Sequence, residues 1–226
     1  MRDLPLVRGA RVTKSFTIGD QRVLAIRDAT FTIEFGARIA LVGPSGSGKS
    51  TLVHLIAGLD QPSGGSIIWP ALGTEVTLRP GPIGLAFQGP SLLPPLTVLE
   101  NAALPMILAG HTDAESNAAA RELLDIFDVS ALADRLPEEL SGGQSQRVGL
   151  ARAFAGGPEL ILADEPTGQL DHDGAARVLD AMLTLADLRR TAVVVATHDP
   201  EVAARLDTGW SMRDGTLTVG SIAWSS

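Results

Sequence analysis

The chain has 226 residues, of which 45% are hydrophobic, and a formal net charge of −8 at pH 7. This length suits one α/β domain, or one domain with a small inserted lobe, and the apolar content is enough for a large core. The acidic balance argues against a nucleic-acid-binding surface, and the absence of cysteine excludes disulfides and thiolate metal sites. A chain without cysteine is also compatible with the cytosol.

The sequence offers no membrane-spanning segment of its own. Its first eight residues lack the apolar stretch of a signal peptide. No window approaches the roughly 18 apolar residues needed to cross a bilayer. The best attempt, residues 102–109, is short and contains Pro105. We therefore expect any membrane role to depend on a partner chain.

The first third of the chain predicts a strand–loop–helix unit. Phe31, Ile33 and Phe35 alternate with polar residues, which predicts a half-buried strand. Residues 38–42 are more continuously apolar and predict a buried strand, after which residues 43–48 form a glycine-rich turn. A helix then follows, with its apolar residues at Leu52, Val53, Leu55 and Ile56.

The middle of the chain predicts helices and no convincing strand, from about Pro90 to Gly156. Thr112 and Glu115 have capping-box spacing and open a helix with an apolar side. Glycine- and proline-rich pieces flank the region, at residues 80–82, 94–95 and 156–158. We therefore expect a helical lobe inserted into an α/β core.

Two further apolar runs, residues 160–163 and 192–196, predict buried strands, each preceded by a helix. Residues 210–219 predict a hairpin that turns at Asp214 and Gly215. Alternation of buried strands and helices implies a parallel sheet covered on both faces. The predicted fold class is therefore α/β.

A phosphate-binding loop is the first chemical motif. Residues 43–50 match G-x-x-x-x-G-K-[ST] through Gly43, Gly48, Lys49 and Ser50. Backbone N–H groups and the helix N-terminus favour phosphate oxygens there, Lys49 would reach the β- and γ-phosphates, and Ser50 would bind Mg²⁺. Such a match arises by chance in about 1 chain in 100 of this length, but here the required strand and helix flank it.

Asp164 and Glu165 end the apolar run that begins at Leu160. At such a strand end in a P-loop fold, the first acid holds Mg²⁺, usually through water, and the adjacent carboxylate can polarise an attacking water. Taken alone, the pair could equally be a strand-ending turn. The phosphate loop and the segment described next favour the chemical interpretation.

Residues 140–147, which we call the signature segment, read Leu-Ser-Gly-Gly-Gln-Ser-Gln-Arg. Ser141 and Gln144 have the spacing of a capping box, so Ser141 could simply cap a helix. A glycine-flanked helix N-terminus with a serine hydroxyl is also an anion site. Both interpretations can hold together.

These three motifs, in the chain order phosphate loop, signature segment and Asp-Glu pair, resemble those of the ATP-binding cassette (ABC) ATPases, and the resemblance covers nearly the whole chain. It implies a P-loop NTPase of RecA-like fold with a parallel sheet, N-terminal antiparallel β elements and the inserted helical lobe. It further implies a single domain, with the core at about residues 1–89 and 157–226 and the lobe at about 90–156. The implied cofactors are ATP and Mg²⁺.

The resemblance also implies a role for each matching residue. The catalytic residues would be Glu165, His198, Gln88 and Lys49, and Mg²⁺ would be held by Ser50, Gln88 and Asp164. ATP would be bound within the chain by Phe16, Gly43, Pro44, Ser45, Gly46, Ser47, Gly48, Lys49, Ser50 and Thr51. The opposite subunit's ATP would be contacted by Ser141, Gly142, Gly143, Gln144 and Asp171.

Some of these residues are weak evidence by themselves. A lone glutamine such as Gln88 is normally solvated, and His198 could be incidental to the helix start at Asp199 and Pro200. The family more often has Tyr where Phe16 stands, but Phe keeps the π-face that stacks on adenine. It also often has Gln in place of Ser145, and Asn in place of Gln169.

The resemblance implies two kinds of partner and no nucleic acid. A membrane permease would bind the helical lobe around residues 88–96, which places the chain peripherally at the cytoplasmic face of the cell membrane. A second ABC ATPase, identical or homologous, would complete a dimer that ATP closes and hydrolysis reopens. That cycle would power a transporter or a transporter-like mechanical machine.

A finer resemblance points to one branch of the family, the lipoprotein-releasing, macrolide-exporting and cell-division ATPases. It is carried by residues 58–62, 92–94, 99–101, 104–105 and 163–168. The chain departs from that branch between Ser66 and Phe87, where it is shorter and has Pro80-Gly-Pro82 in place of a basic helical stretch. That shortening is similar to some importer ATPases.

Two other functions are compatible with parts of the pattern. A soluble ABC ATPase acting on nucleic acid or ribosomes would usually have two cassettes or a long coiled-coil insertion, which this chain lacks. A nucleotide-gated binding module without turnover would have lost Glu165 or His198, and both are present.

Overall fold

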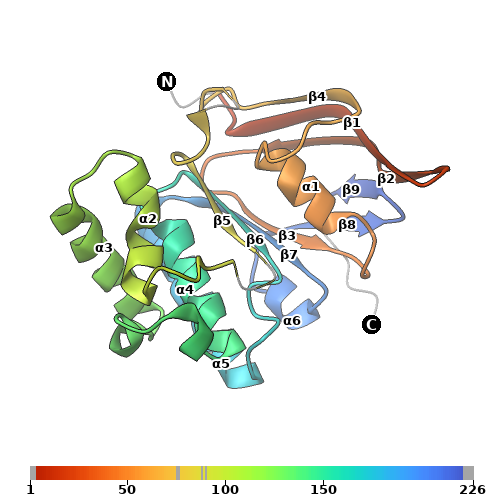
Figure 1. Cartoon of the computed structure of the whole chain (residues 1–226). Helices are drawn as coiled ribbons and strands as arrows, with labels where there is room; N and C mark the ends of the chain where they lie inside the picture. The colour runs from red at the N-terminus through yellow and green to blue at the C-terminus, as the bar shows by residue number, and fades with distance from the viewer. Residues whose placement is uncertain (1–3, 75–76, 88, 90, 221–226) are drawn as a thin grey trace. The chain divides into compact units, whose positions relative to one another are not determined.

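The computed structural model describes residues 4–74, 77–87, 89 and 91–220, which form a mixed α/β fold (Figure 1). The described residues form two compact units. One contains the chain up to Leu78 together with the chain from Ala192 onward, and the other runs from Arg79 to Thr191. The phosphate loop lies in the first unit, whereas the signature segment and Glu165 lie in the second.

The first unit is built on strands in the order β4-β1-β2-β9-β8-β3-β7. Their bounds are β1 Val7–Ile18, β2 Gln21–Ile33, β3 Arg38–Val42, β4 Gly64–Ile68, β7 Ala192–Thr197, β8 Thr208–Arg213 and β9 Thr216–Val219. Strand β1 pairs antiparallel with β2 and β4, and β8 pairs antiparallel with β9. Strand β3 pairs parallel with β7 and β8. Antiparallel N-terminal strands therefore adjoin a parallel core, as the sequence predicts.

Apart from Arg38 and Thr197 at their ends, strands β3 and β7 consist of apolar residues, as expected for strands whose side chains are buried on both faces. Two helices belong to this unit, α1 Lys49–Ile56 and α6 Pro200–Ala203. Phe31 and Trp210 anchor the core, with ring centroids 5.4 Å apart at an interplanar angle of 50°. Each of these two rings is at most 3% exposed.

The sequence-based prediction was wrong at Phe35. Strand β2 ends at Ile33, and Phe35 lies in the turn before β3 with 37% of its surface exposed. Gly36 follows with φ 67°, a conformation that reverses the chain and breaks the alternation on which the prediction rested. The predicted hairpin is confirmed, with Asp214 and Gly215 at φ 49° and 79° between β8 and β9.

The second unit contains two parallel strands, β5 Ile83–Ala86 and β6 Leu160–Asp164. Its helices are α2 Val98–Leu108, α3 Asp113–Ile126, α4 Gly142–Phe154 and α5 His172–Arg189, with 3-10 turns at Ser130–Leu132 and Pro137–Glu139. Between Ser91 and Gly156 the described residues form helices and turns and no strand. Strand β5 is too short to be recognised in the sequence.

Capping boxes start α2, α3 and α4 in this unit. Thr97 with Glu100 begins α2, a capping box that was not predicted, and Thr112 with Glu115 begins α3, as the sequence predicts. Pro105 lies inside α2 and does not end it. Phe127 and Phe154 join α3 to α4 in the core, with ring centroids 6.0 Å apart.

Among the described residues, none of the helices combines the length and the apolar character that a bilayer span requires. The two compact units differ in their limits from the predicted core and lobe, because β5, β6 and α5 group with the helices. The predicted lobe, residues 90–156, remains a prediction about how the family's domain is divided.

Candidate functional site

The phosphate loop connects β3 to α1. Gly48, the residue that precedes α1, has φ 107°, and a Cβ there would lie 2.5 Å from the Ala25 carbonyl oxygen. Helix α1 has no side-chain cap among the described residues, so its first N–H groups are directed into the loop without a protein acceptor from a capping side chain. A phosphate group is the ligand that such a helix end favours.

Lys49 lies across the loop. Its Nζ donates to the carbonyl oxygens of Gly43 and Pro44 at 2.7 and 3.1 Å, and the residue is 7% exposed. Ser47 is 4% exposed, and its Oγ has no hydrogen-bond partner within the described part of the chain. A buried cation, an orphaned hydroxyl and an uncapped helix are a donor set that fits the phosphates of ATP.

The other predicted residues of the phosphate loop are more exposed to solvent than Lys49 and Ser47. Pro44, Ser45 and Gly46 are exposed, and Ser50 and Thr51 in the first turn of α1 are half-buried. His198 follows β7 and is exposed, while Gly43 follows β3. Because Val42 and Thr197 pair in the parallel register of β3 and β7, Gly43 and His198 leave the same edge of the sheet.

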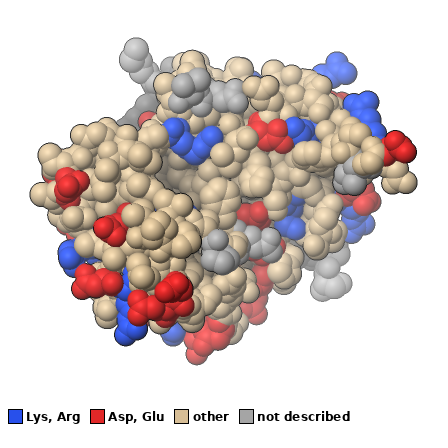
Figure 2. Space-filling model, viewed as in Figure 1, with Lys and Arg blue, Asp and Glu red and all other residues tan. Residues whose placement is uncertain are grey.

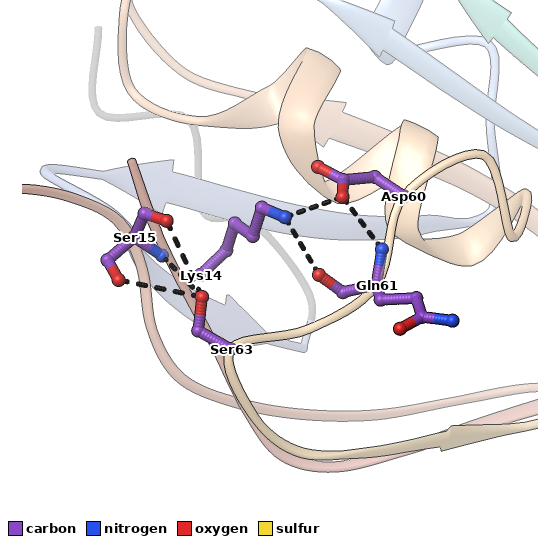
Figure 3. A network of polar contacts seen from close by, with 5 residues as sticks. All are labelled: Lys14, Ser15, Asp60, Gln61 and Ser63. Atoms are coloured by element: carbon purple, nitrogen blue, oxygen red, sulfur yellow. Dashed lines mark hydrogen bonds and ion pairs between the residues drawn. The ribbon is translucent and has the colours of Figure 1, made fainter. Parts of the chain in front are cut away.

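Phe16 lies on β1 and is 39% exposed. The Lys14 Nζ lies 5.1 Å from its ring centroid, a cation–π contact. Lys14 is held in turn by the Asp60 carboxylate and, at 2.8 Å, by the Gln61 carbonyl oxygen (Figure 3). The hydrogen bond from Lys14 lowers the pKa of Asp60. The loop after α1 therefore fixes the strand that carries Phe16.

In the second unit, Asp164 ends β6 and Glu165 begins the turn that follows. The two residues are 6% and 8% exposed. Glu165 has φ 49°, in the left-handed region that a residue with a side chain rarely adopts. Its carbonyl oxygen accepts hydrogen bonds from Gly168 N at 3.2 Å and from Gln146 Nε2 at 2.7 Å.

Ser141 caps α4 in a complete capping box, as predicted. Gln144 N donates to Ser141 Oγ at 3.2 Å, and Ser141 N donates to Gln144 Oε1 at 2.8 Å. Ser141 and Gly142 are exposed. Asp171 caps α5 by accepting from Gly174 N at 2.8 Å, so this residue has a local structural role as well as the predicted one.

In the first unit the structure places the phosphate loop and His198 at the same sheet edge, whereas no contact joins Phe16 to them among the bonds described above. In the second unit the signature segment and Glu165 are joined by Gln146, which the sequence analysis missed although it lies two residues after Gln144. Two further residues gave no signal in the sequence: Lys14, and Arg152, which donates to the carbonyl oxygen and the Oγ of Ser91 at 2.8 and 2.6 Å. Burial lowers the pKa of Arg152. Gln88 lies outside the described residues.

A strand, a glycine-rich phosphate loop and a helix, with a second strand ending in Asp-Glu, define a P-loop nucleoside triphosphatase. A family model described as "ABC transporter" matches residues 26–168. The chain belongs to this family. It is an ATP-binding and ATP-hydrolysing subunit of an ABC transporter, and the family predicted from its sequence is confirmed.

Individual relatives agree with this assignment. The chain is 38% identical over 224 residues to the lipoprotein-releasing system ATP-binding protein LolD of Legionella pneumophila (strain Paris), covering 96% of this chain and 98% of that protein. The dimeric structure of MJ0796, a bacterial ABC transporter cassette, superposes with a TM-score of 0.88 at 34% identity, covering 93% of this chain and 96% of that one.

Two further solved structures support the fold. A dimeric post-hydrolysis state of MJ0796, bound to ADP and Pi, has a TM-score of 0.87 at 34% identity and covers 94% of this chain and 98% of that one. The cbiO1 subunit of Clostridium perfringens, part of the transporter complex cbiONQ, has a TM-score of 0.80 at 23% identity, covering 96% and 88%. The predicted P-loop NTPase fold is confirmed.

Proposed function

We propose that two copies of this chain, or one copy and a homologue, enclose two ATP molecules head to tail and drive a membrane permease by closing and reopening. The main observation behind the proposal is that the chain has two helix N-termini suited to bind phosphate, those of α1 and α4. The phosphate loop leaves α1 uncapped, whereas the signature segment caps α4 itself and stays exposed at Ser141 and Gly142. The solved dimers of MJ0796, at 34% identity, support a dimer here.

In this proposal the phosphate loop binds ATP within each chain. Lys49 contacts the terminal phosphates, the backbone of residues 43–51 surrounds them, and Phe16 stacks on the adenine. Ser50 and Asp164 would hold Mg²⁺, since hydroxyl and carboxylate oxygens are the hard donors that this ion prefers. The ion would supply positive charge that neutralises the developing phosphate charge. Gln88 is proposed as a further contact to it.

Glu165 is proposed as the general base for water. Its carboxylate follows a buried strand, the residue itself is 8% exposed, and its backbone is held in a fixed turn. A positioned base of this kind contributes roughly 10²- to 10⁴-fold to a rate. His198, exposed at the end of β7, is proposed to contact the γ-phosphate.

The signature segment is proposed to complete the partner's site. Ser141, Gly142, Gly143 and Gln144 begin α4, whose positive dipole end favours the opposite subunit's γ-phosphate. Asp171, at the start of α5, would lie at the same interface. Ser145 stands where the family often has Gln, and it is 7% exposed, so we expect little effect on the interface from this departure.

The permease partner is proposed to bind near residues 88–96, at the cytoplasmic face of the membrane. Leu93 in this segment is 43% exposed, an apolar side chain available to a protein partner. On the face drawn in Figure 2, Lys and Arg side chains are scattered among Asp and Glu rather than gathered into a basic patch. A drawn face of mixed charge is compatible with a protein partner.

The 38% identity to LolD favours a permease of the lipoprotein-releasing type. The short connection from β4, which ends at Ile68, to β5, which begins at Ile83, is the feature that departs from this branch. Purification of the chain with the products of its neighbouring genes would test the assignment. A few-helix permease with a large extracytoplasmic domain supports this branch, and a many-helix permease with a binding protein supports an importer.

The replacement Glu165→Gln tests the catalytic part of the proposal. The amide has the same shape but cannot accept the proton, so hydrolysis should fall by roughly 10²-fold or more while ATP still binds. Because the signature segment still engages ATP, the variant should accumulate as a closed dimer, seen by size-exclusion chromatography with ATP and Mg²⁺. Near-normal hydrolysis would remove Glu165 from this role.

A further inference from the structure

The turn after β6 is held from outside by one side chain. Gln146, on the second turn of α4, donates from Nε2 to the Glu165 carbonyl oxygen at 2.7 Å and accepts at Oε1 from Gln169 N at 3.2 Å. The two contacts lie at opposite ends of residues 165–169. Both the donor and the acceptor of this amide are therefore used on the same turn.

The turn needs such a restraint because of its backbone. Glu165 has φ 49°, a conformation that persists in a residue with a side chain only where its surroundings impose it. Within the turn, Gly168 N supplies a second and longer hydrogen bond to the Glu165 carbonyl oxygen, at 3.2 Å. The direction of the Glu165 carboxylate follows from this backbone, so the Gln146 amide acts on the carboxylate through the main chain.

The start of α4 also packs on the same turn. A Cβ on Gly143 would lie 2.7 Å from Leu170 Cδ2, so the signature glycine and the end of the turn are in direct contact. Gln146 lies one helical turn beyond this contact. The helix whose N-terminus is proposed to reach the partner's nucleotide is thus bonded to the turn that carries the chain's own general base, all within one compact unit.

We propose that Gln146 is a positioning residue for ATP hydrolysis, which holds the Glu165 backbone and links it to the signature helix. The inference rests on the proposed role of Glu165 as general base. Gln146 need not touch ATP. Its amide fixes where the carboxylate points, and a shift of α4 at the dimer interface is transmitted through it to the other site of the same chain.

The test compares Gln146→Met and Gln146→Glu in the full chain with ATP and Mg²⁺. Met keeps the length of the side chain and loses both hydrogen bonds. Glu keeps the acceptor for Gln169 N but sets a carboxylate oxygen against the Glu165 carbonyl oxygen. For both variants we expect kcat to fall roughly 10- to 100-fold, the scale of a displaced catalytic group. KM and ATP affinity should stay near the parent's values.

A double variant separates positioning from general damage. When Glu165→Gln is already present, Gln146→Met should lower the residual rate less than twofold, because its effect passes through a carboxylate that has been removed. Thr112→Ala, which breaks the capping box of α3 in the same unit, is the matched control for lost stability. It should leave kcat unchanged at a temperature where all variants are folded.

If Gln146→Met or Gln146→Glu has the parent's kcat, or if Gln146→Met acts equally with and without the Glu165 carboxylate, Gln146 is not a positioning residue. If Glu165→Gln itself hydrolyses ATP normally, the proposed function fails instead. A loss in kcat that disappears in the Glu165→Gln background supports the proposal.

Discussion

The chain has two glycine-rich helix starts, and they are completed in opposite ways. Helix α1, after the phosphate loop, begins at Gly48 with no side-chain cap among the described residues. Helix α4, after the signature segment, begins at Ser141 with a full capping box formed with Gln144. The first helix end leaves N–H groups for a ligand, whereas the second satisfies part of its own requirement.

This difference matches the two roles proposed for them. A phosphate loop that binds ATP within the chain gains from being incomplete, since the nucleotide supplies the missing acceptors. In the proposed dimer, the signature segment would meet its nucleotide only when the partner arrives. It must keep its shape before that, and the capping box provides the shape while leaving Ser141 exposed.

We expect the largest effect on ATP binding at the phosphate loop, where α1 has no side-chain cap among the described residues. Lys49→Ala removes a cation that can make charge-assisted hydrogen bonds to phosphate, each contributing about 1.5–3 kcal/mol. ATP affinity should fall roughly 10²-fold or more while the fold persists. The parent should be stabilised by about 2.7 kcal/mol at an ATP concentration 100 times its Kd, and a thermal shift assay should show this gain disappear in the variant. Unchanged affinity together with normal turnover would overturn the phosphate-loop assignment.

Substitution in the signature segment, at the capped N-terminus of α4, should impair hydrolysis more than ATP binding. Ser141→Arg would place a large cation in the proposed dimer interface, so hydrolysis should be nearly lost while ATP affinity in calorimetry stays near the parent's. Mixing it with Lys49→Ala creates dimers in which one site carries both changes and the other carries neither. Up to about a quarter of the parent's rate should return, because half of the dimers are mixed and one of their two sites is intact.

The same experiment can fail in a decisive way. Parent-like hydrolysis by unmixed Ser141→Arg would contradict a site composed from two chains. The assembled membrane complex is the preferred sample, because the proposed permease would hold the two ATPase subunits together.

Features that depend on residues close together in the sequence could be predicted from it. The phosphate loop, both capping boxes and the Asp-Glu pair are contiguous motifs, and their local structures formed where the sequence placed them. Phe35 failed because alternation does not reveal where a strand ends, and the turn at Gly36 decides that. The proposed roles of Glu165, of the signature segment and of His198 remain predictions, since they depend on a nucleotide and a second chain.

Gln146 and Lys14 show what local motifs cannot reveal. Gln146 matters through its bonds to residues 165 and 169, which are 19 and 23 positions away in the sequence. Lys14 matters through Asp60, 46 positions away. In both cases the chain must fold before the partner is known, so the spacing of residues carries no signal.

Loss of an N-cap residue should have a smaller effect, seen mainly in the free energy of unfolding. Ser141→Ala removes the acceptor for Gln144 N and should cost about 1 kcal/mol in the free energy of unfolding, within the usual range of 0.5–2 kcal/mol for a lost N-cap. Thr112→Ala should cost a similar amount for α3. Denaturant unfolding measures both, and an ATPase assay should then separate them, because Thr112 is not one of the proposed site residues and only Ser141 should affect turnover.

The smallest effect concerns Phe16 and the ion pair behind it. Lys14→Met removes a cation–π contact of about 0.5–1 kcal/mol, so ATP affinity should weaken roughly 2- to 5-fold with kcat unchanged. Asp60→Asn should act in the same direction because it loosens Lys14. Arg135→Met, which breaks the exposed Arg135–Glu139 pair in the other unit, is the matched control and should change neither quantity.

The pH dependence of that ion pair has a definite sign. The pKa of Asp60 is lowered by its hydrogen bond from Lys14, so the pair stabilises the folded state fully at pH values above the ordinary aspartate pKa of about 3.9. The stabilisation should be lost as the pH falls below that value and through the lower folded-state pKa. Comparing parent and Asp60→Asn by urea unfolding from pH 7 down to pH 3 should therefore show a difference that shrinks below about pH 4. A difference that stays constant over this range would mean that the Asp60 charge does not hold Lys14 beneath the ring that the nucleotide is proposed to use.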